Sequence, residues 1–117
     1  MNRDGKVVVE AGAFENGYAD LKGGALPQLD TLAAKLRKSG RHVKIIGHTA
    51  ADASEIYNVE MSLRRAEAVK CYLSGKGVDP HRVTTEGRGG TEPVASNRTA
   101  RGRELNRRVE VCVNDPD

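Results

Sequence analysis

The chain has 117 residues and no internal repeats, which predicts one domain over residues 1–117 with a core from about residue 6 to about residue 113. Aromatic residues make up 3% of the sequence and the net charge is only +3 at pH 7, so nucleic-acid binding is a weak hypothesis that depends on the basic stretch 98–108. No apolar run approaches the roughly 18 residues of a membrane helix, and the start MNRDGKVVVE lacks the apolar core of a signal peptide. We therefore expect a soluble domain that belongs to a longer secreted or membrane-anchored parent protein.

A strand and a helix are predicted first. The β-branched run from Val7 to Val9 indicates a strand over residues 6–14, and the segment 14–19 after it reads as a tight loop. Apolar residues then recur at helical spacing; Pro27 suits the first turn of this helix, and Gly40 suits its C-terminal cap. The apolar positions of the predicted helix are Leu26, Leu29, Leu32, Ala33 and Leu36.

A second strand and a second helix follow. Residues 42–49 carry the β-branched pattern expected of a buried strand. Asp52 or Ser54 is predicted to cap the next helix, which ends at Gly75 or Gly77. In this amphipathic helix the apolar residues Val59, Ala66, Val69 and Leu73 recur at helical spacing, and Glu60 is predicted to pair with Arg64 on the outer side.

The remaining sequence predicts two more strands. Residues 82–86 form the third strand, glycines and Pro93 break regular structure as far as Asn97, and residues 101–105 form a helical turn. The alternation RRVEVCV over residues 107–113 indicates a half-buried last strand. The order β-α-β-α-β-(short α)-β predicts an α+β fold, with a four-stranded sheet of mixed parallel and antiparallel pairing and with helices on one face.

The second helix carries a polar row near its start. Asn58, Ser62 and Arg65 lie at positions i, i+4 and i+7, so they project from one side, and the row is predicted to face the preceding loop. A guanidinium beside the positive end of a helix is suited to binding a carboxylate. The spacing equally allows Arg65 to pair with Glu55 or Glu60 on the surface, and it does not decide between the two.

The groups that an enzyme needs are not recognisable. No nucleophile with a base, matched pair of acids or metal-ligand set stands out, so we expect neither enzymatic activity nor a cofactor or metal. His42, His48 and His81 lack companions at metal-ligand spacing, and His48 is expected to be hydrogen-bonded within the fold. Gly87 to Gly90 is interpreted as a turn rather than a phosphate-binding loop. Cys71 and Cys112 are not expected to form a disulfide.

A longer pattern of residues resembles a known family. The pattern consists of Gly47-His48-Thr49, Tyr57-Asn58, Met61-Ser62, Arg65-Ala66, Val69, Tyr72-Leu73, Gly77-Val78, Arg82-Val83, Gly87, Pro93, Asn97, Thr99, Gly102-Arg103 and 106–110. From about Phe14 to Val113 the chain is similar to the OmpA-like C-terminal domains of OmpA, the Pal lipoprotein, MotB stator proteins and type VI secretion accessory proteins. The resemblance implies a non-enzymatic periplasmic domain that binds peptidoglycan through the meso-diaminopimelate of the stem peptide and so anchors an envelope protein.

The resemblance also implies a set of site residues. Arg65 matches the family arginine that holds a diaminopimelate carboxylate, and Asn58 matches the asparagine beside it. Met61 takes the place of a leucine that lines the site. The loop from Asn16 to Ala19, which includes Gly17, is expected to supply backbone contacts, and Thr49 completes the predicted site. The arginines at 107 and 108 are interpreted as structural or as secondary contacts.

One position departs from the family. After Gly47-His48-Thr49 the family usually has an Asp whose carboxylate meets the ligand's ammonium group, and here Ala50 stands there. Three interpretations follow: Asp52 or Glu55 supplies the missing anion, the domain keeps the fold but has weakened or lost wall binding, or Ala50 is an engineered change. The sequence leaves these open, together with the type of parent protein and the oligomeric state.

Overall fold

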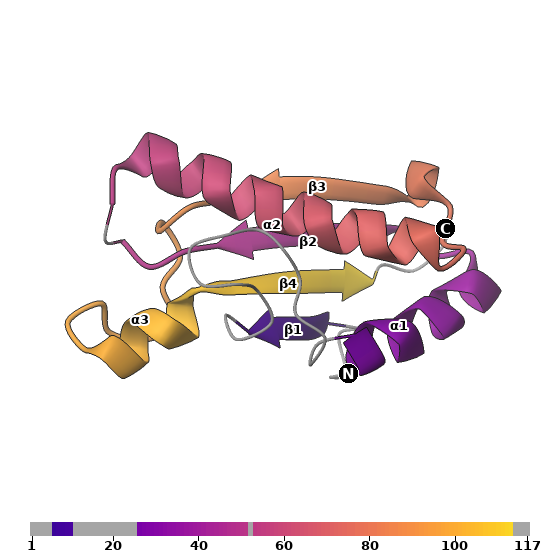
Figure 1. Cartoon of the computed structure of the whole chain (residues 1–117), viewed down its shortest axis with the longest axis horizontal. Coiled ribbons are helices and arrows are strands. Elements are labelled where there is room, and N and C mark those ends of the chain that lie inside the picture. The colour runs from indigo at the N-terminus through magenta and orange to yellow at the C-terminus, as the bar shows by residue number, and fades with distance from the viewer. Residues whose placement is uncertain (1–5, 11–25, 52, 114–117) are drawn as a thin grey trace.

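The computed structural model describes residues 6–10, 26–51 and 53–113. In chain order, the elements are β1 (Lys6–Glu10), α1 (Leu26–Ser39), β2 (Val43–His48), α2 (Glu55–Gly75), the short 3-10 helix η3 (Pro80–Arg82), β3 (Val83–Gly87), α3 (Ala100–Asn106) and β4 (Arg108–Val113), as shown in Figure 1. This is the predicted order. The predicted strand over residues 6–14 is confirmed as far as Glu10, and residues 11–25, which include the predicted loop 14–19, lie outside the described part of the chain.

The four strands form one mixed sheet in the order β1-β4-β2-β3. β2 and β3 are parallel and joined through α2, whereas β4 lies between β1 and β2 and pairs antiparallel with both. The predicted parallel crossover and the predicted antiparallel last strand are therefore confirmed. Because β4 runs back between the other strands, its first residue, Arg108, pairs with the last residue of β2, His48.

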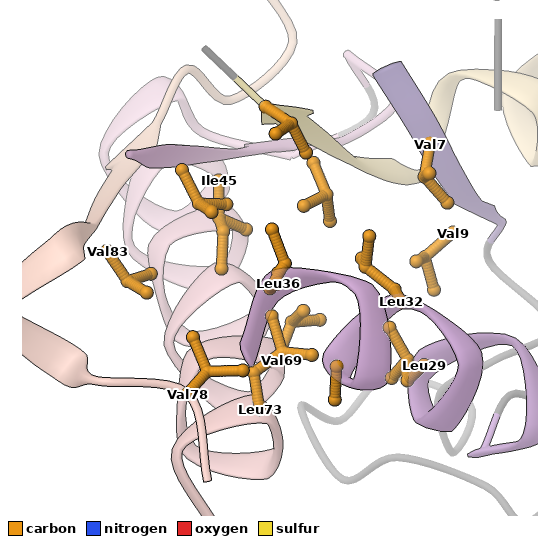
Figure 2. Close-up of a cluster of buried hydrophobic side chains, with 14 of the residues drawn as sticks. Val7, Val9, Leu29, Leu32, Leu36, Ile45, Val69, Leu73, Val78 and Val83 are labelled. Atoms are coloured by element: carbon orange, nitrogen blue, oxygen red, sulfur yellow. The ribbon is translucent and has the colours of Figure 1, made fainter. Parts of the chain in front are cut away.

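The apolar core lies between the sheet and the two long helices. Figure 2 shows side chains of α1, α2 and the strands meeting there. Alternate residues of the strands point to this side, which is why Val109 and Val111 of β4 are fully buried, while Cys112, which follows Val111 and points to the opposite face, is only half-buried. The helix residues that complete the core are Leu29, Leu32, Ala33 and Leu36 of α1 and Ala66, Val69 and Leu73 of α2.

The ends of the long helices follow their sequence signals. Ser54 caps α2 by accepting a hydrogen bond from the Tyr57 backbone N–H, so the cap is the second of the two predicted candidates. Gly40 after α1 and Gly77 after α2 have φ angles of +66° and +98°, a region that only glycine adopts without strain. One prediction for α2 is wrong. Glu60 and Arg64 are both exposed and form no ion pair, since two solvated side chains gain little from pairing.

The start of α2 lies unusually close to the strand ends. A Cβ added at Gly47 of β2 would lie 1.9 Å from the carbonyl oxygen of Ser62, and one added at Gly87 of β3 would lie 2.6 Å from that of Val59. Gly47 and Gly87 are neighbours across the two parallel strands. The paired glycines therefore let the helix backbone rest directly on the carboxyl ends of β2 and β3, and this contact positions the polar row of α2.

Candidate functional site

The predicted site residues gather where β2 ends and α2 begins. The loop after β2 is held to the turn after β3, because the Thr49 backbone N–H donates to the Gly89 carbonyl oxygen at 2.8 Å. Gly89 has a φ angle of +56° and lies in the turn that the sequence predicted for residues 87–90. Ala50 in the loop is fully buried, at 0% exposure. Thr49 and Ala50, the first two residues after β2, are thus part of the packed structure.

The polar row of α2 faces inward. Asn58, Ser62 and Arg65 are 4%, 0% and 7% exposed, so all three lie on one side of the helix, as predicted, but they are buried against the rest of the domain. Asn58 Nδ2 donates to the Ala53 carbonyl oxygen at 3.2 Å. Ser62 Oγ donates to the Val59 carbonyl oxygen and accepts from the Gly89 backbone N–H at 3.0 Å. Asn58 and Ser62 therefore hold backbone in place around Arg65.

The surroundings of Arg65 are unfavourable for its positive charge. Burial lowers the pKa of the Arg65 guanidinium, the nearby positive charge of Arg107 lowers it further, and Tyr57 acts in the opposite direction. A buried guanidinium with a second positive charge nearby is suited to binding an anion. The alternative in which Arg65 pairs with Glu55 or Glu60 on the surface is wrong, because Arg65 is buried while both glutamates are exposed and unpaired.

The other predicted site residues are placed as follows. Thr49 is 7% exposed, and its Oγ1 has no hydrogen-bond partner among the described residues. Met61 is half-buried, one turn before Arg65 on α2. Asn16, Gly17 and Asp52 lie outside the described residues. Glu55, the other candidate for the missing anion, is exposed in the first turn of α2.

A second group of buried polar residues consists of Arg108 and Glu110 of β4 and His48 of β2. These residues lie on the face of the sheet that points away from the apolar core. The Arg108 guanidinium is 6% exposed and donates to Glu110 at 2.9 Å and to the Glu92 carbonyl oxygen at 3.1 Å. Lys6 pairs with the same glutamate at 3.2 Å. Burial alone raises the pKa of Glu110, but the hydrogen bonds from Arg108 and Lys6 outweigh this effect and hold it below its ordinary value. The structural interpretation of Arg108 is consistent with these contacts.

His48 belongs to the same group. It is 1% exposed, and its Nε2 lies 3.5 Å from a Glu110 carboxylate oxygen. Neither ring nitrogen has a hydrogen-bond partner within the described part of the chain, so the predicted internal hydrogen bond is not formed. Burial and the positive charge of Arg108 lower the pKa of His48, and Glu110 offsets part of this. His48 is therefore a neutral, buried strand-end residue at neutral pH.

Sequence reasoning missed the arrangement around α3. Asn106, at the end of this helix, is fully buried and accepts hydrogen bonds at Oδ1 from the backbone N–H groups of Val94 and Ala95, at 2.7 and 3.0 Å. Its Nδ2 donates to Asn97 Oδ1 at 2.8 Å. Asn97 and Asn106 both appear in the family pattern, but strand alternation and helical spacing do not predict their hydrogen-bond partners. Only the folded loop shows that they connect α3 to the site.

Within the described residues, no cluster of three or more His, Cys, Asp or Glu side chains is placed to hold a metal ion. No helix in the same part of the chain is long and apolar enough to cross a membrane. Cys71 and Cys112 are both free thiols, as predicted.

Comparisons with known proteins match most of the chain. A family model described as the OmpA family matches residues 13–107. Outer membrane protein A of Bordetella avium is 44% identical over 110 residues, which cover 92% of this chain and 57% of that protein. Peptidoglycan-binding protein ArfA of Mycobacterium tuberculosis is 40% identical over 103 residues, covering 87% of this chain and 32% of that protein. The chain thus spans about half or less of the length of these curated relatives.

The fold is also found in solved structures. The crystal structure of the peptidoglycan-associated lipoprotein from Burkholderia pseudomallei matches with a TM-score of 0.85 at 26% identity, covering 92% of this chain and 89% of that chain. The predicted α+β architecture is therefore confirmed.

Proposed function

Because the chain belongs to the OmpA family, whose domains bind without catalysing a reaction, we propose that it binds peptidoglycan non-covalently through the diaminopimelate of the stem peptide. Binding of this kind fastens a cell-envelope protein to the wall from the periplasmic side. The names of two similar proteins, a peptidoglycan-binding protein and a peptidoglycan-associated lipoprotein, support peptidoglycan as the partner. In this proposal the chain acts as a single binding module of a longer protein.

The observation that carries the proposal is the buried guanidinium of Arg65 beside that of Arg107. Burial and the nearby positive charge of Arg107 disfavour the charge on Arg65, as the lowered pKa of Arg65 indicates, so a carboxylate that reaches this guanidinium gains more than it would from an exposed arginine. One charge-assisted hydrogen bond contributes about 1.5–3 kcal/mol, which corresponds to roughly a tenfold to hundredfold change in affinity. The diaminopimelate side chain carries the carboxylate that fits this role.

Co-sedimentation with purified diaminopimelate-type peptidoglycan tests the proposal. Arg65→Ala should lose about nine-tenths or more of the bound protein, and Arg65→Gln, which keeps most of the side-chain volume, should behave alike. Arg64→Ala is the matched control, because Arg64 is the neighbouring exposed arginine and should bind as the wild type does. Melting curves establish that each variant is folded. Equal recovery of wild type, Arg65→Ala and Arg65→Gln would overturn the proposal.

A second candidate function is a structural or protein-interaction domain that has lost wall binding. It is favoured by Ala50, which is fully buried where the family usually has the carboxylate that meets the ligand's ammonium group. Ala50→Asp distinguishes the two functions. A rise in peptidoglycan affinity of tenfold or more from a weak wild-type level would mean that the anion is missing, whereas a nearly unchanged, strong affinity would mean that another acid, such as Asp52 or Glu55, already serves.

A further inference from the structure

The start of the loop between β2 and α2 is fastened to the rest of the domain by two hydrogen bonds that the proposed function does not use. At its first residue, the Thr49 backbone N–H donates to Gly89. Two residues later, the Ala51 backbone N–H donates to the side-chain Oδ1 of Asn97 at 3.3 Å, across 46 positions of sequence. Ala50 therefore lies between two anchored neighbours, and only the second anchor is a side chain that a substitution can remove.

Asn97 is itself held in place by α3. Its Oδ1 accepts a second hydrogen bond, from Asn106 Nδ2 at 2.8 Å, and its backbone carbonyl oxygen accepts one from Arg103 Nη1 at 3.0 Å. Asn106 is fully buried, so its position is fixed by packing and by its bonds to the backbone of residues 94 and 95. The position of the Ala51 N–H is thus set by a chain of bonds that begins at a buried side chain.

The position of α3 supports this chain of hydrogen bonds. Thr99 caps the helix by accepting from the Gly102 backbone N–H at 2.9 Å. A Cβ at Gly102 would lie 1.8 Å from the Ser96 carbonyl oxygen, so the helix rests directly on the segment that carries Asn97. α3 therefore acts as a support that presents one amide oxygen to the loop after β2.

From these contacts we propose that Asn97 is a positioning residue for ligand binding. It holds the Thr49–Ala51 segment in its observed conformation at the end of β2, without contacting the ligand, and Asn106 and α3 hold Asn97. The inference depends on the proposed function, since it assigns Asn97 a role at the same site. It adds a requirement of its own, which is that affinity depends on an acceptor atom at position 97.

Both hydrogen bonds at Asn97 Oδ1 are accepted and neither is donated by its side chain, which makes the requirement testable. Asn97→Asp keeps an acceptor oxygen at this position, whereas Asn97→Ala removes it. Ser96→Ala is the matched control, because Ser96 Oγ accepts only from the Arg98 backbone N–H within the same loop. A general loosening of the loop would affect Asn97→Ala and Ser96→Ala alike.

The experiment measures the dissociation constant for a soluble diaminopimelate-containing muropeptide and the hydrogen-exchange rate of the Ala51 amide by NMR in all four proteins. Asn97→Ala should bind about three- to tenfold more weakly and exchange the Ala51 amide faster, while Asn97→Asp and Ser96→Ala should resemble the wild type in both respects. Wild-type affinity in a folded Asn97→Ala variant would overturn the positioning role alone, as would equal weakening in Asn97→Asp. No binding by the wild-type protein would overturn the proposed function and this inference together.

Discussion

The two halves of α2 are both buried, but by different means. The C-terminal half presents Ala66, Val69 and Leu73, each at 0% exposure, to the apolar core. The N-terminal half presents Asn58, Ser62 and Arg65, and its backbone rests on the glycines that end β2 and β3. Between Asn58 and Leu73, one helix thus passes from a buried polar site to an apolar core.

Together with the proposed function, this difference predicts that stability and binding are separated along α2. Apolar contacts are non-directional, and in the C-terminal half they hold the helix against the core. Hydrogen bonds from Ser62 and Asn58 and the close backbone contact at Gly47 fix how far it approaches the sheet. Substitutions in the C-terminal half should therefore change the free energy of unfolding, and substitutions in the N-terminal half should change ligand affinity as well.

The largest expected effect is in the apolar half. Leu73→Ala removes a fully buried side chain and leaves a cavity, which should lower the free energy of unfolding by about 2–5 kcal/mol, measured by urea denaturation. Ile56→Ala is the control, because Ile56 is 76% exposed and should change stability by no more than about 0.5 kcal/mol. Under conditions where Leu73→Ala is fully folded, its peptidoglycan affinity should equal that of the wild type. A parallel loss of affinity would contradict the separation of the two halves.

A somewhat smaller effect is expected at the contact between α2 and β2. Gly47→Ala places a Cβ against the Ser62 carbonyl, which should destabilise the domain by about 1–3 kcal/mol and also weaken peptidoglycan binding, because the helix start must move away from the sheet. Gly75→Ala is the matched control. No atom lies within 4 Å of the added Cβ there, so this variant should be stabilised by about 0.4–1 kcal/mol with unchanged affinity. Unchanged affinity in Gly47→Ala would show that the approach of α2 is not critical.

The smallest expected effect comes from the buried charges beside the site. The pKa of His48 is lowered in the folded state by burial and by Arg108, so the unfolded state takes up a proton more readily and stability is lost as the pH falls below about 6.5. The pKa of Glu110 is also lowered, so a second loss follows below its ordinary value of 4.5. One proton changes the free energy of unfolding by at most about 1.4 kcal/mol per pH unit.

Denaturation of His48→Gln at pH values from 7 to below 4.5 checks the histidine. This variant should lose the decline between pH 6.5 and 5 and keep the decline at lower pH, to which Glu110 contributes together with the other carboxyl groups of lowered pKa, Asp79 and Glu86. An unchanged decline in the upper range would assign it to another group.

The fold was predictable because its signals are local and repeated. The spacing of Leu29, Leu32 and Leu36 indicates α1, and the alternation of Val109, Val111 and Val113 indicates β4 with its core-facing side. The order of elements then leaves few ways to pair the strands. Helix ends were predicted to within a residue or two where a glycine or a capping serine marks them.

The site was predictable only in part, because its contacts join residues far apart in sequence. Helical spacing placed Asn58, Ser62 and Arg65 on one side of α2, but it does not tell how closely a sheet approaches that side. The neighbour of Arg65 is Arg107, 42 positions away by residue number, and the partner of Ala51 is Asn97. No periodic pattern in the sequence indicates either of these proximities, since both depend on the path of the segment between β3 and α3.

The central claim is that the Arg65 guanidinium binds a diaminopimelate carboxylate. Its most direct test is a thermodynamic cycle that compares two muropeptides, one with the diaminopimelate side-chain carboxylate free and one with it amidated, in titrations of the wild type and of Arg65→Ala. The claim predicts that amidation weakens wild-type binding by about tenfold to a hundredfold, and that Arg65→Ala binds both muropeptides with the same low affinity. An amidation effect of equal size in the two proteins would contradict it, because the carboxylate would then be recognised by some other group.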